Sequence, residues 1–123
     1  MTIRVLVADD QSMVRAGFRM LLSGEQDIEV IAEASNGHEA VDKAARFRPS
    51  VVLMDIRMPA LDGITAAREI RAKYPHVKII GLSEYGNDYT TDAMERAGAV
   101  GVYRKSMALE ELYPAIKAIH PAT

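Results

Sequence analysis

The sequence predicts an α/β fold in which helices enclose a parallel sheet. Short apolar runs rich in β-branched residues alternate with longer segments of helical periodicity. Several of these runs are almost entirely apolar, as in strands that helices cover on both faces. With 123 residues and a hydrophobic content of 49%, the chain can bury a sizeable core. We therefore expect residues 1–123 to form a single domain.

The apolar runs are the expected strands, and each is followed by a helical segment. This arrangement gives five βα units joined by right-handed crossovers. It predicts a flavodoxin-like, doubly wound (βα)5 parallel sheet with strand order 2-1-3-4-5 and three layers, α/β/α. The expected strands are Ile3–Ala8, Ile28–Ala34, Val51–Met54, Lys78–Leu82 and Val100–Tyr103.

Helix starts are marked by capping residues. The second helix should begin near Asn36, because Glu39 follows three residues later as in a capping box. Asp62 should cap the third helix and Ser106 the fifth. The fourth helix, roughly residues 88–97, has few apolar anchors and should be the most weakly held. The residues expected to face the core in the first and fifth helices are Val14, Phe18, Leu21, Leu22, Leu109, Leu112, Ile116 and Ile119.

Composition and charge argue against several classes of function. A net charge of −2, with Lys and Arg scattered along the chain, does not fit a nucleic-acid-binding surface. The absence of Cys excludes disulfides and thiolate metal sites. The sequence shows no secretory leader and no apolar run near the roughly 18 residues of a membrane helix. We expect a soluble cytoplasmic protein.

Polar residues at the ends of the expected strands form the candidate site. Asp9 and Asp10 follow the first strand, and Asp55 follows the third. Ser83 and Lys105 come at the ends of the fourth and fifth. In open α/β sheets, ligands bind beyond the carboxyl ends of the strands, near the switch in strand order. Strands 1 and 3 flank that switch, so we expect the three carboxylates to converge.

Three neighbouring carboxylates need a proton or a cation between them. Two unit charges about 4 Å apart repel by about 4 kcal/mol at an effective dielectric constant of about 20. Oxygen ligands favour a hard ion, and Mg²⁺ shares its coordination shell with phosphate oxygens. Lys105 can meet an anionic oxygen, and Ser83 can donate a hydrogen bond to another. Singly these residues have ordinary structural explanations, but together they suit phosphoryl transfer to a carboxylate.

The stretches that carry these residues resemble two-component response-regulator receiver domains, and they run from end to end of the chain. Arg15-Ala16-Gly17 and the stretch that begins Leu82-Ser83 are most similar to NarL/LuxR-type transcriptional regulators. Full-length relatives of that type carry a C-terminal helix-turn-helix DNA-binding domain, which this chain lacks. We therefore expect either an isolated receiver fragment or a stand-alone receiver. The matching stretches are Val7-Ala8-Asp9-Asp10-Gln11, Leu53-Met54-Asp55-Ile56-Arg57-Met58-Pro59, Leu61-Asp62-Gly63, Gly81-Leu82-Ser83 and Arg104-Lys105-Ser106.

The resemblance implies that a sensor histidine kinase donates a phosphoryl group to the chain in a Mg²⁺-dependent reaction. The chain would act only on its own Asp, including autodephosphorylation, and would control an output such as transcription. It would bind neither nucleic acid nor membrane directly, and it could form a homodimer. The implied roles are Asp55 as phosphoacceptor, Lys105 and Ser83 as partners of the phosphoryl group, and Asp9, Asp10, Asp55 and the Arg57 backbone carbonyl as Mg²⁺ ligands.

Three positions depart from the pattern of the family. Val102 stands where the family often has an aromatic residue, and the adjacent Tyr103 should point to the opposite face of the sheet. Glu84 follows Ser83, where a small or apolar residue is usual. Pro114 lies inside the fifth helix and predicts a kink.

Two alternatives remain open. One is a receiver-like binding module that is never phosphorylated, which Glu84 and Val102 keep in consideration. The other is a haloacid-dehalogenase-like phosphatase, which also uses acidic residues, a Ser or Thr, a Lys and Mg²⁺. Its nucleophile follows the first strand in an Asp-x-Asp pattern, which Asp9-Asp10-Gln11 lacks.

Overall fold

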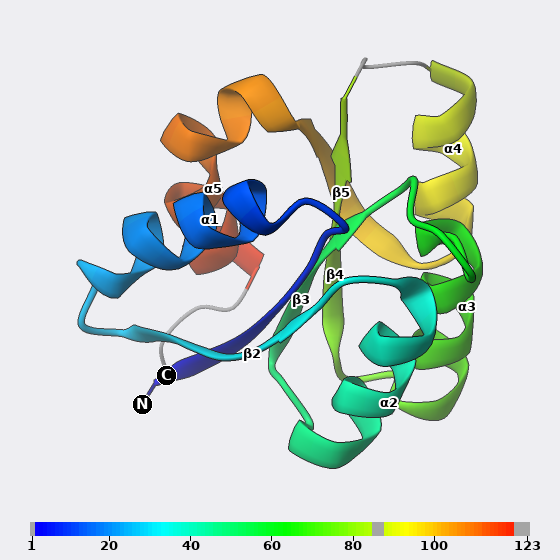
Figure 1. Cartoon of the computed structure of the whole chain (residues 1–123), viewed down its shortest axis with the longest axis horizontal. Helices are drawn as coiled ribbons and strands as arrows, with labels where there is room; N and C mark the ends of the chain where they lie inside the picture. Colours follow the sequence, from blue (N-terminus) through cyan, green and yellow to red (C-terminus); the bar gives the residue numbers. More distant parts are fainter. Residues whose placement is uncertain (1, 85–87, 120–123) are drawn as a thin grey trace.

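The computed structural model describes residues 2–84 and 88–119, and strands alternate with helices throughout them (Figure 1). The alternation predicted from the sequence is therefore confirmed. The elements are β1 (Ile3–Ala8), α1 (Ser12–Ser23), β2 (Ile28–Ala34), α2 (Gly37–Phe47), β3 (Val51–Asp55), α3 (Gly63–Lys73), β4 (Lys78–Ser83), α4 (Asp88–Arg96), β5 (Ala99–Arg104) and α5 (Lys105–Ile119).

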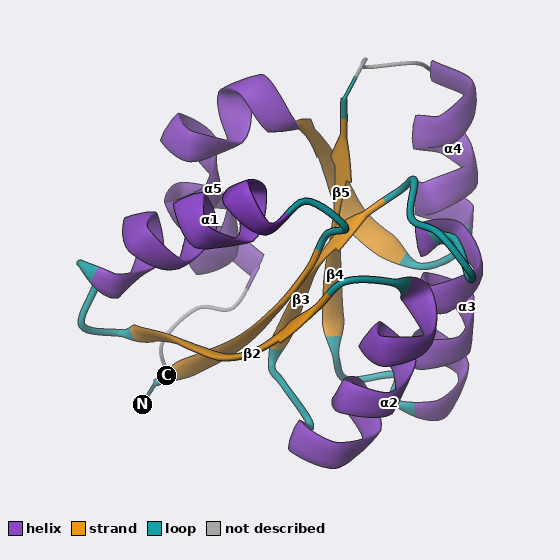
Figure 2. Ribbon diagram, in the orientation of Figure 1, coloured by secondary structure: helices purple, strands orange, loops and turns teal. Residues whose placement is uncertain are grey.

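The five strands form one parallel sheet in the order β2-β1-β3-β4-β5, as the sequence predicts. Helices α1 and α5 cover one face, and α2, α3 and α4 cover the other (Figures 1 and 2). Strand order reverses at β1, which pairs with β2 on one side and with β3 on the other. The carboxyl ends of β1 and β3 are therefore neighbours, and the residues that follow them share one edge of the sheet.

Alternate residues of the strands pack into two separate cores. On the side of α1 and α5, Phe18 and Leu112 belong to a buried cluster that Tyr103 also packs against. On the other side, Met94 of α4 is buried in a second cluster, and Val102 packs against that one. Val102 and Tyr103 thus face opposite sides of the sheet, as predicted. The central strand β3 is buried along its whole length.

Helix caps match the sequence prediction at two of three positions. The Asn36 side chain accepts a hydrogen bond from the Glu39 backbone N–H at 2.9 Å, which starts α2. The Asp62 side chain accepts one from the Thr65 backbone N–H at 2.8 Å, which starts α3. The prediction that Ser106 caps the fifth helix is wrong. Strand β5 continues to Arg104 and the helix begins at the next residue, so no loop separates them and Ser106 lies inside the first turn.

The core-facing prediction holds in part for α1 and α5. Phe18, Leu22, Leu112 and Ile116 are buried. Val14, Leu21 and Ile119 are half-buried and pack against the same cluster, whereas the Leu109 side chain lies outside the described residues. Helix α5 runs through Pro114, which is exposed. No helix in residues 2–84 and 88–119 has both the length and the apolar character needed to cross a membrane.

Candidate functional site

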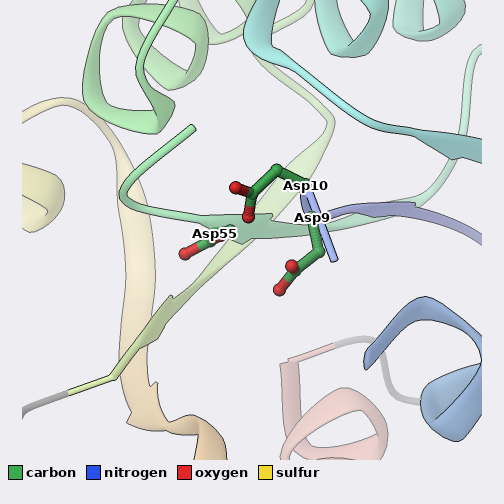
Figure 3. Close-up of side chains that lie close together, drawn as sticks. All are labelled: Asp9, Asp10 and Asp55. Carbon is green, nitrogen blue, oxygen red and sulfur yellow. The ribbon is translucent and has the colours of Figure 1, made fainter. Parts of the chain in front are cut away.

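Three carboxylates meet beyond the carboxyl ends of β1 and β3 (Figure 3). Asp9 and Asp10 follow β1, and Asp55 is the last residue of β3. One carboxylate oxygen from each lies within 4.8 Å of the others. Asp9 and Asp55 are buried, while Asp10 is exposed. The expected convergence of the three acids is therefore present in the structure.

The Asp9 backbone and side chain are held from several directions. Its backbone N–H donates to the Ala34 carbonyl of β2 at 3.0 Å. Its carboxylate Oδ1 accepts a hydrogen bond from the Gln11 backbone N–H at 2.9 Å. The other oxygen, Oδ2, is buried and accepts no hydrogen bond of ordinary geometry from the described residues. A buried acceptor of this kind is costly unless a cation meets it.

Lys105 supplies a positive charge to this cluster. Its Nζ atom lies 2.8 Å from Asp9 Oδ2 and 3.2 Å from Asp55 Oδ2. The Lys105 side chain is only 13% exposed, so the two ion pairs are largely shielded from water. Lys105 reaches the acids because β5 ends beside β4 and α5 starts at Lys105 itself.

The buried charges shift two pKa values. Burial raises the pKa of Asp55 from 3.8 to about 7, and the neighbouring Asp9 charge adds to the rise. The Lys105 ammonium and the Arg57 backbone N–H, which lies 3.3 Å from Asp55 Oδ1, act in the opposite direction. Burial lowers the pKa of Lys105, but its pairing with Asp9 and Asp55 outweighs that effect and the pKa is raised. The raised pKa of Asp55 means that its ionised form is disfavoured at this site, and a further cation would stabilise it.

The loop between β3 and α3 packs tightly behind Asp55. The Gly63 backbone N–H donates to the Ile56 carbonyl at 2.9 Å. A Cβ atom on Gly63 would lie 1.9 Å from the Asp55 carbonyl oxygen, so only glycine fits there. Ala60 in the same loop adopts a left-handed conformation with φ of 67°. This packing fixes the backbone from which the Asp55 side chain extends.

The cluster opens into a cleft of about 160 Å³ between β1, β3, β4 and the start of α4. Ser83, the last residue of β4, lies in its wall and is 6% exposed. Glu84 lies at the same cleft and is exposed. The lining residues are Asp10, Gln11, Asp55, Ile56, Arg57, Leu82, Ser83, Glu84, Thr90 and Lys105. The predicted site residues Asp10, Asp55, Arg57, Ser83 and Lys105 line this cleft, whereas Asp9 is buried and is not among the lining residues.

Some residues of the site were not predicted from the sequence. Gln11 contributes a backbone N–H to Asp9, and Thr90 joins the cleft from α4. Arg15 of α1 donates from Nη1 to the Asp9 backbone carbonyl at 2.7 Å. Gln11 and Arg15 stand in the matching stretches of the sequence, but neither was assigned a role there. The Arg15 contact depends on how a long side chain folds back over the helix start, which residue spacing alone does not specify.

The acidic cluster is chemically suited to a hard divalent cation. Its potential ligands are carboxylate oxygens, and three carboxylates share the single Lys105 ammonium, which lies 2.8 Å from Asp9 Oδ2 and 3.2 Å from Asp55 Oδ2. Because Asp10 is exposed and lines the cleft, such an ion would remain accessible to a ligand in the cleft. Asp9, Asp10 and Asp55 are therefore residues that could hold a metal ion.

Comparison with known proteins identifies the class. Residues 5–117 match the response regulator receiver domain family. The chain is 41% identical over 116 residues to the uncharacterized transcriptional regulatory protein YxjL of Bacillus subtilis (strain 168), which covers 94% of this chain and 53% of that protein. The chain spans about half the length of these curated relatives, 53% of YxjL and 55% of the response regulator GacA of Pseudomonas viridiflava.

Solved structures agree with this assignment. The response regulator domain of Thermotoga maritima CheB matches with a TM-score of 0.90 and 30% identity, covering 100% of this chain and 99% of that one. A LuxR-family two-component response regulator from Aurantimonas sp. SI85-9A1 also gives a TM-score of 0.90, with 33% identity, over 97% of this chain and 85% of that one. This chain belongs to the response regulator receiver domain family. The resemblance to NarL/LuxR-type regulators is thereby confirmed.

Proposed function

We propose that this receiver domain accepts a phosphoryl group on Asp55 from the phosphohistidine of a sensor histidine kinase, in a Mg²⁺-dependent reaction. The observation that carries the proposal is the position of Asp55. Its carboxylate lies at a cleft, 3.2 Å from the Lys105 ammonium and within 4.8 Å of oxygens from two further acids. A carboxylate nucleophile beside a cation and a metal-binding cluster suits phosphoryl transfer, in which positioning and charge neutralisation provide most of the catalysis.

In the proposed reaction, a carboxylate oxygen of Asp55 forms a bond to phosphorus while the bond between phosphorus and the histidine nitrogen breaks. The electron pair of the broken bond stays on the imidazole. Lys105 pairs with an oxygen of the transferred group, since its ammonium already contacts Asp55. Asp9, Asp10, Asp55 and the Arg57 backbone carbonyl would hold Mg²⁺. When bound, the ion would neutralise charge on the carboxylates and on the phosphoryl oxygens.

Phosphorylation would then shift the region around α4 from one of two arrangements towards the other. The Ser83 hydroxyl lies in the wall of the cleft at the end of β4 and would donate to a phosphoryl oxygen. Thr90 brings the first turns of α4 to the same cleft. A phosphoryl group carries a charge of about −1.5 to −2. Moving a two-state equilibrium from 1:99 to 99:1 needs about 5.5 kcal/mol of differential interaction, and two new polar contacts to this charge supply part of it.

We propose that the output is control of transcription through a further domain or through self-association. The relative YxjL is described as a transcriptional regulatory protein, and the chain spans about half of its length. In this proposal the receiver does not contact DNA itself, and its partners are a sensor histidine kinase and, upon activation, a second copy. The chemistry is a single transfer to the chain's own Asp followed by autodephosphorylation, rather than turnover of a separate substrate.

Intact-mass spectrometry after incubation with acetyl phosphate and Mg²⁺ tests this function. The expected result is a gain of one phosphoryl group that disappears in Asp55→Asn and is strongly reduced in Asp9→Asn. Labelling that persists in Asp55→Asn would contradict the assigned nucleophile. Steady hydrolysis of a phosphate ester without a labelled intermediate on Asp55 would favour a phosphatase. A complete absence of labelling would favour a receiver-like module that binds partners without being phosphorylated.

A further inference from the structure

Arg15 connects the acidic cluster to the outer strand of the sheet. Its Nη1 donates to the backbone carbonyl of Asp9 at 2.7 Å, and its Nε donates to Glu33 Oε1 at 3.0 Å. The Arg15 side chain is 17% exposed, so both bonds are largely protected from competing water. One planar guanidinium therefore joins β2 to the peptide that links the two consecutive acids.

That peptide matters because it determines where Asp10 points. The carbonyl that Arg15 holds belongs to the peptide whose nitrogen is that of Asp10. Asp9 is also fixed by its own N–H and by Gln11, and it is buried. Asp10 is exposed, follows the end of β1, and has no comparable burial to restrict its backbone. Two contacts therefore hold the peptides on either side of Asp10: the Gln11 N–H bonds to Asp9 Oδ1 after it, and Arg15 binds the Asp9 carbonyl before it. Of the two, the Arg15 contact is made by a side chain.

Glu33 holds Arg15 in this orientation. Its second carboxylate oxygen, Oε2, accepts from Arg19 Nε at 2.7 Å, so the Glu33 carboxylate lies between two guanidinium groups on α1. Burial raises the pKa of Glu33, but Arg19 and Arg15 outweigh it and the pKa is lowered, so Glu33 is ionised at neutral pH. Arg19 is 47% exposed and contacts the same carboxylate without the 2.7 Å bond to the Asp9 carbonyl that Arg15 makes.

We propose that Arg15 is a positioning residue for metal binding: by holding the Asp9 carbonyl, it sets the Asp10 carboxylate in the orientation that a divalent cation requires. The inference rests on the proposed function only in taking Mg²⁺ as the ion. Outer contacts that orient metal ligands typically change metal affinity by about 10- to 100-fold when they are removed.

An effect of charge and an effect of positioning predict opposite changes in Mg²⁺ affinity when Arg15 is replaced. Arg15 carries a positive charge next to a cation site, so removing it would strengthen Mg²⁺ binding if charge alone mattered. If orientation of Asp10 dominates, the same change weakens binding. A substitution that removes both the charge and the hydrogen bond therefore separates the two effects by the direction of the result.

The experiment is a Mg²⁺ titration without phosphodonor, in which NMR chemical shifts report binding. It compares the wild type with Arg15→Gln, Arg15→Lys and Arg19→Gln. We expect Arg15→Gln to weaken Mg²⁺ binding about tenfold. Arg15→Lys should weaken it less, because the ammonium can still donate a hydrogen bond. It should nevertheless weaken it, because an ammonium cannot hold the Asp9 carbonyl and Glu33 in one plane. Arg19→Gln is the matched control and should stay within about twofold of the wild type. In metal-free protein, the backbone amide of Asp10 should become more mobile in Arg15→Gln but not in Arg19→Gln.

Equal or tighter Mg²⁺ binding by Arg15→Gln would overturn the proposal, and so would an equal loss in Arg19→Gln. Thermal unfolding of each variant shows whether it is folded at the temperature of the titration. If Arg15→Gln does not fold, Arg15→Lys decides, and wild-type affinity in that variant counts against the proposal. A wild type that binds no Mg²⁺ would instead refute the proposed function, so the two failures are distinguishable.

Discussion

The Lys105 ammonium lies 3.2 Å from Oδ2 of Asp55, yet the pKa of Asp55 is raised to about 7. Burial and the adjacent Asp9 charge together outweigh the ion pair with Lys105. The ionised carboxyl that phosphoryl transfer needs is therefore held in an environment that disfavours it. A bound divalent cation would stabilise the ionised Asp55 carboxylate. The raised pKa of Asp55 has several measurable consequences.

The stability of the metal-free protein should fall as the pH rises from 5 to 8. Because the folded pKa of Asp55 is about 7 and its ordinary value is 3.8, the folded state binds more protons in this window. The free energy of unfolding then decreases by at most about 1.4 kcal/mol per pH unit from this group. Urea unfolding in EDTA at several pH values measures the slope. The free energy of unfolding of Asp55→Asn should depend less on pH and should be higher than that of the wild type at pH 8. Parallel pH profiles for the two proteins would show that Asp55 is not the group responsible.

Removal of the Lys105 charge should destabilise the fold, because it leaves two buried carboxylates without their cation. We expect Lys105→Met to lower the free energy of unfolding by about 3 kcal/mol at pH 8, measured by urea unfolding without metal. Adding Asp55→Asn to that variant should restore part of the loss. Lys73→Met, at an exposed position of α3, should change stability by no more than about 0.5 kcal/mol. Equal losses at the two lysines would contradict the role of the ion pairs.

Magnesium should stabilise the fold through Asp10. A free Mg²⁺ concentration 100 times the dissociation constant would add about 2.7 kcal/mol to the free energy of unfolding. At the same concentration, Asp10→Asn should gain less than about 1 kcal/mol, because it loses a ligand oxygen of the cluster. Thermal unfolding with and without Mg²⁺ measures the difference. Asp42→Asn, exposed on α2, serves as the control and should respond like the wild type.

The close packing behind Asp55 should make Gly63 intolerant of a side chain. In Gly63→Ala the new Cβ would lie 1.9 Å from the Asp55 carbonyl oxygen, and a backbone atom cannot move aside cheaply. We expect a loss of about 1–3 kcal/mol of stability by urea unfolding. Gly17→Ala provides the comparison, since a Cβ there meets nothing within 4 Å. That variant should gain roughly 0.5–1 kcal/mol, because alanine favours the helix. A neutral Gly63→Ala would show that the loop adapts.

Much of the fold could be predicted from the sequence because each strand is a short apolar run and each crossover a helical pattern. The last residue of each strand was harder to predict. Ser83 and Asp55 are the last residues of their strands rather than the first residues beyond them, and β5 extends to Arg104. The capping prediction at Ser106 failed for the same reason, since residue type suggests a cap only where a loop precedes the helix. Pairing irregularities near Ile31 and Val100 left no signal in the apolar pattern.

The candidate site could be predicted in its acids and its lysine because strand order brings their positions to one edge. What the sequence could not supply were contacts made by backbone atoms and long side chains. The Gln11 N–H reaches Asp9 through a turn, and Arg15 reaches the Asp9 carbonyl across the start of α1. Such contacts depend on rotamers and on the local path of the chain, not on spacing. The requirement for Gly63 likewise became visible only with the Asp55 carbonyl in place.

The most direct test of the central claim is to locate the phosphoryl group. Borohydride reduction after incubation with acetyl phosphate and Mg²⁺ converts an aspartyl phosphate to homoserine, which peptide mass spectrometry assigns to a residue. We expect homoserine at position 55 and nowhere else in the chain. Homoserine at Asp9, Asp10 or another carboxylate, with Asp55 unmodified, would contradict it.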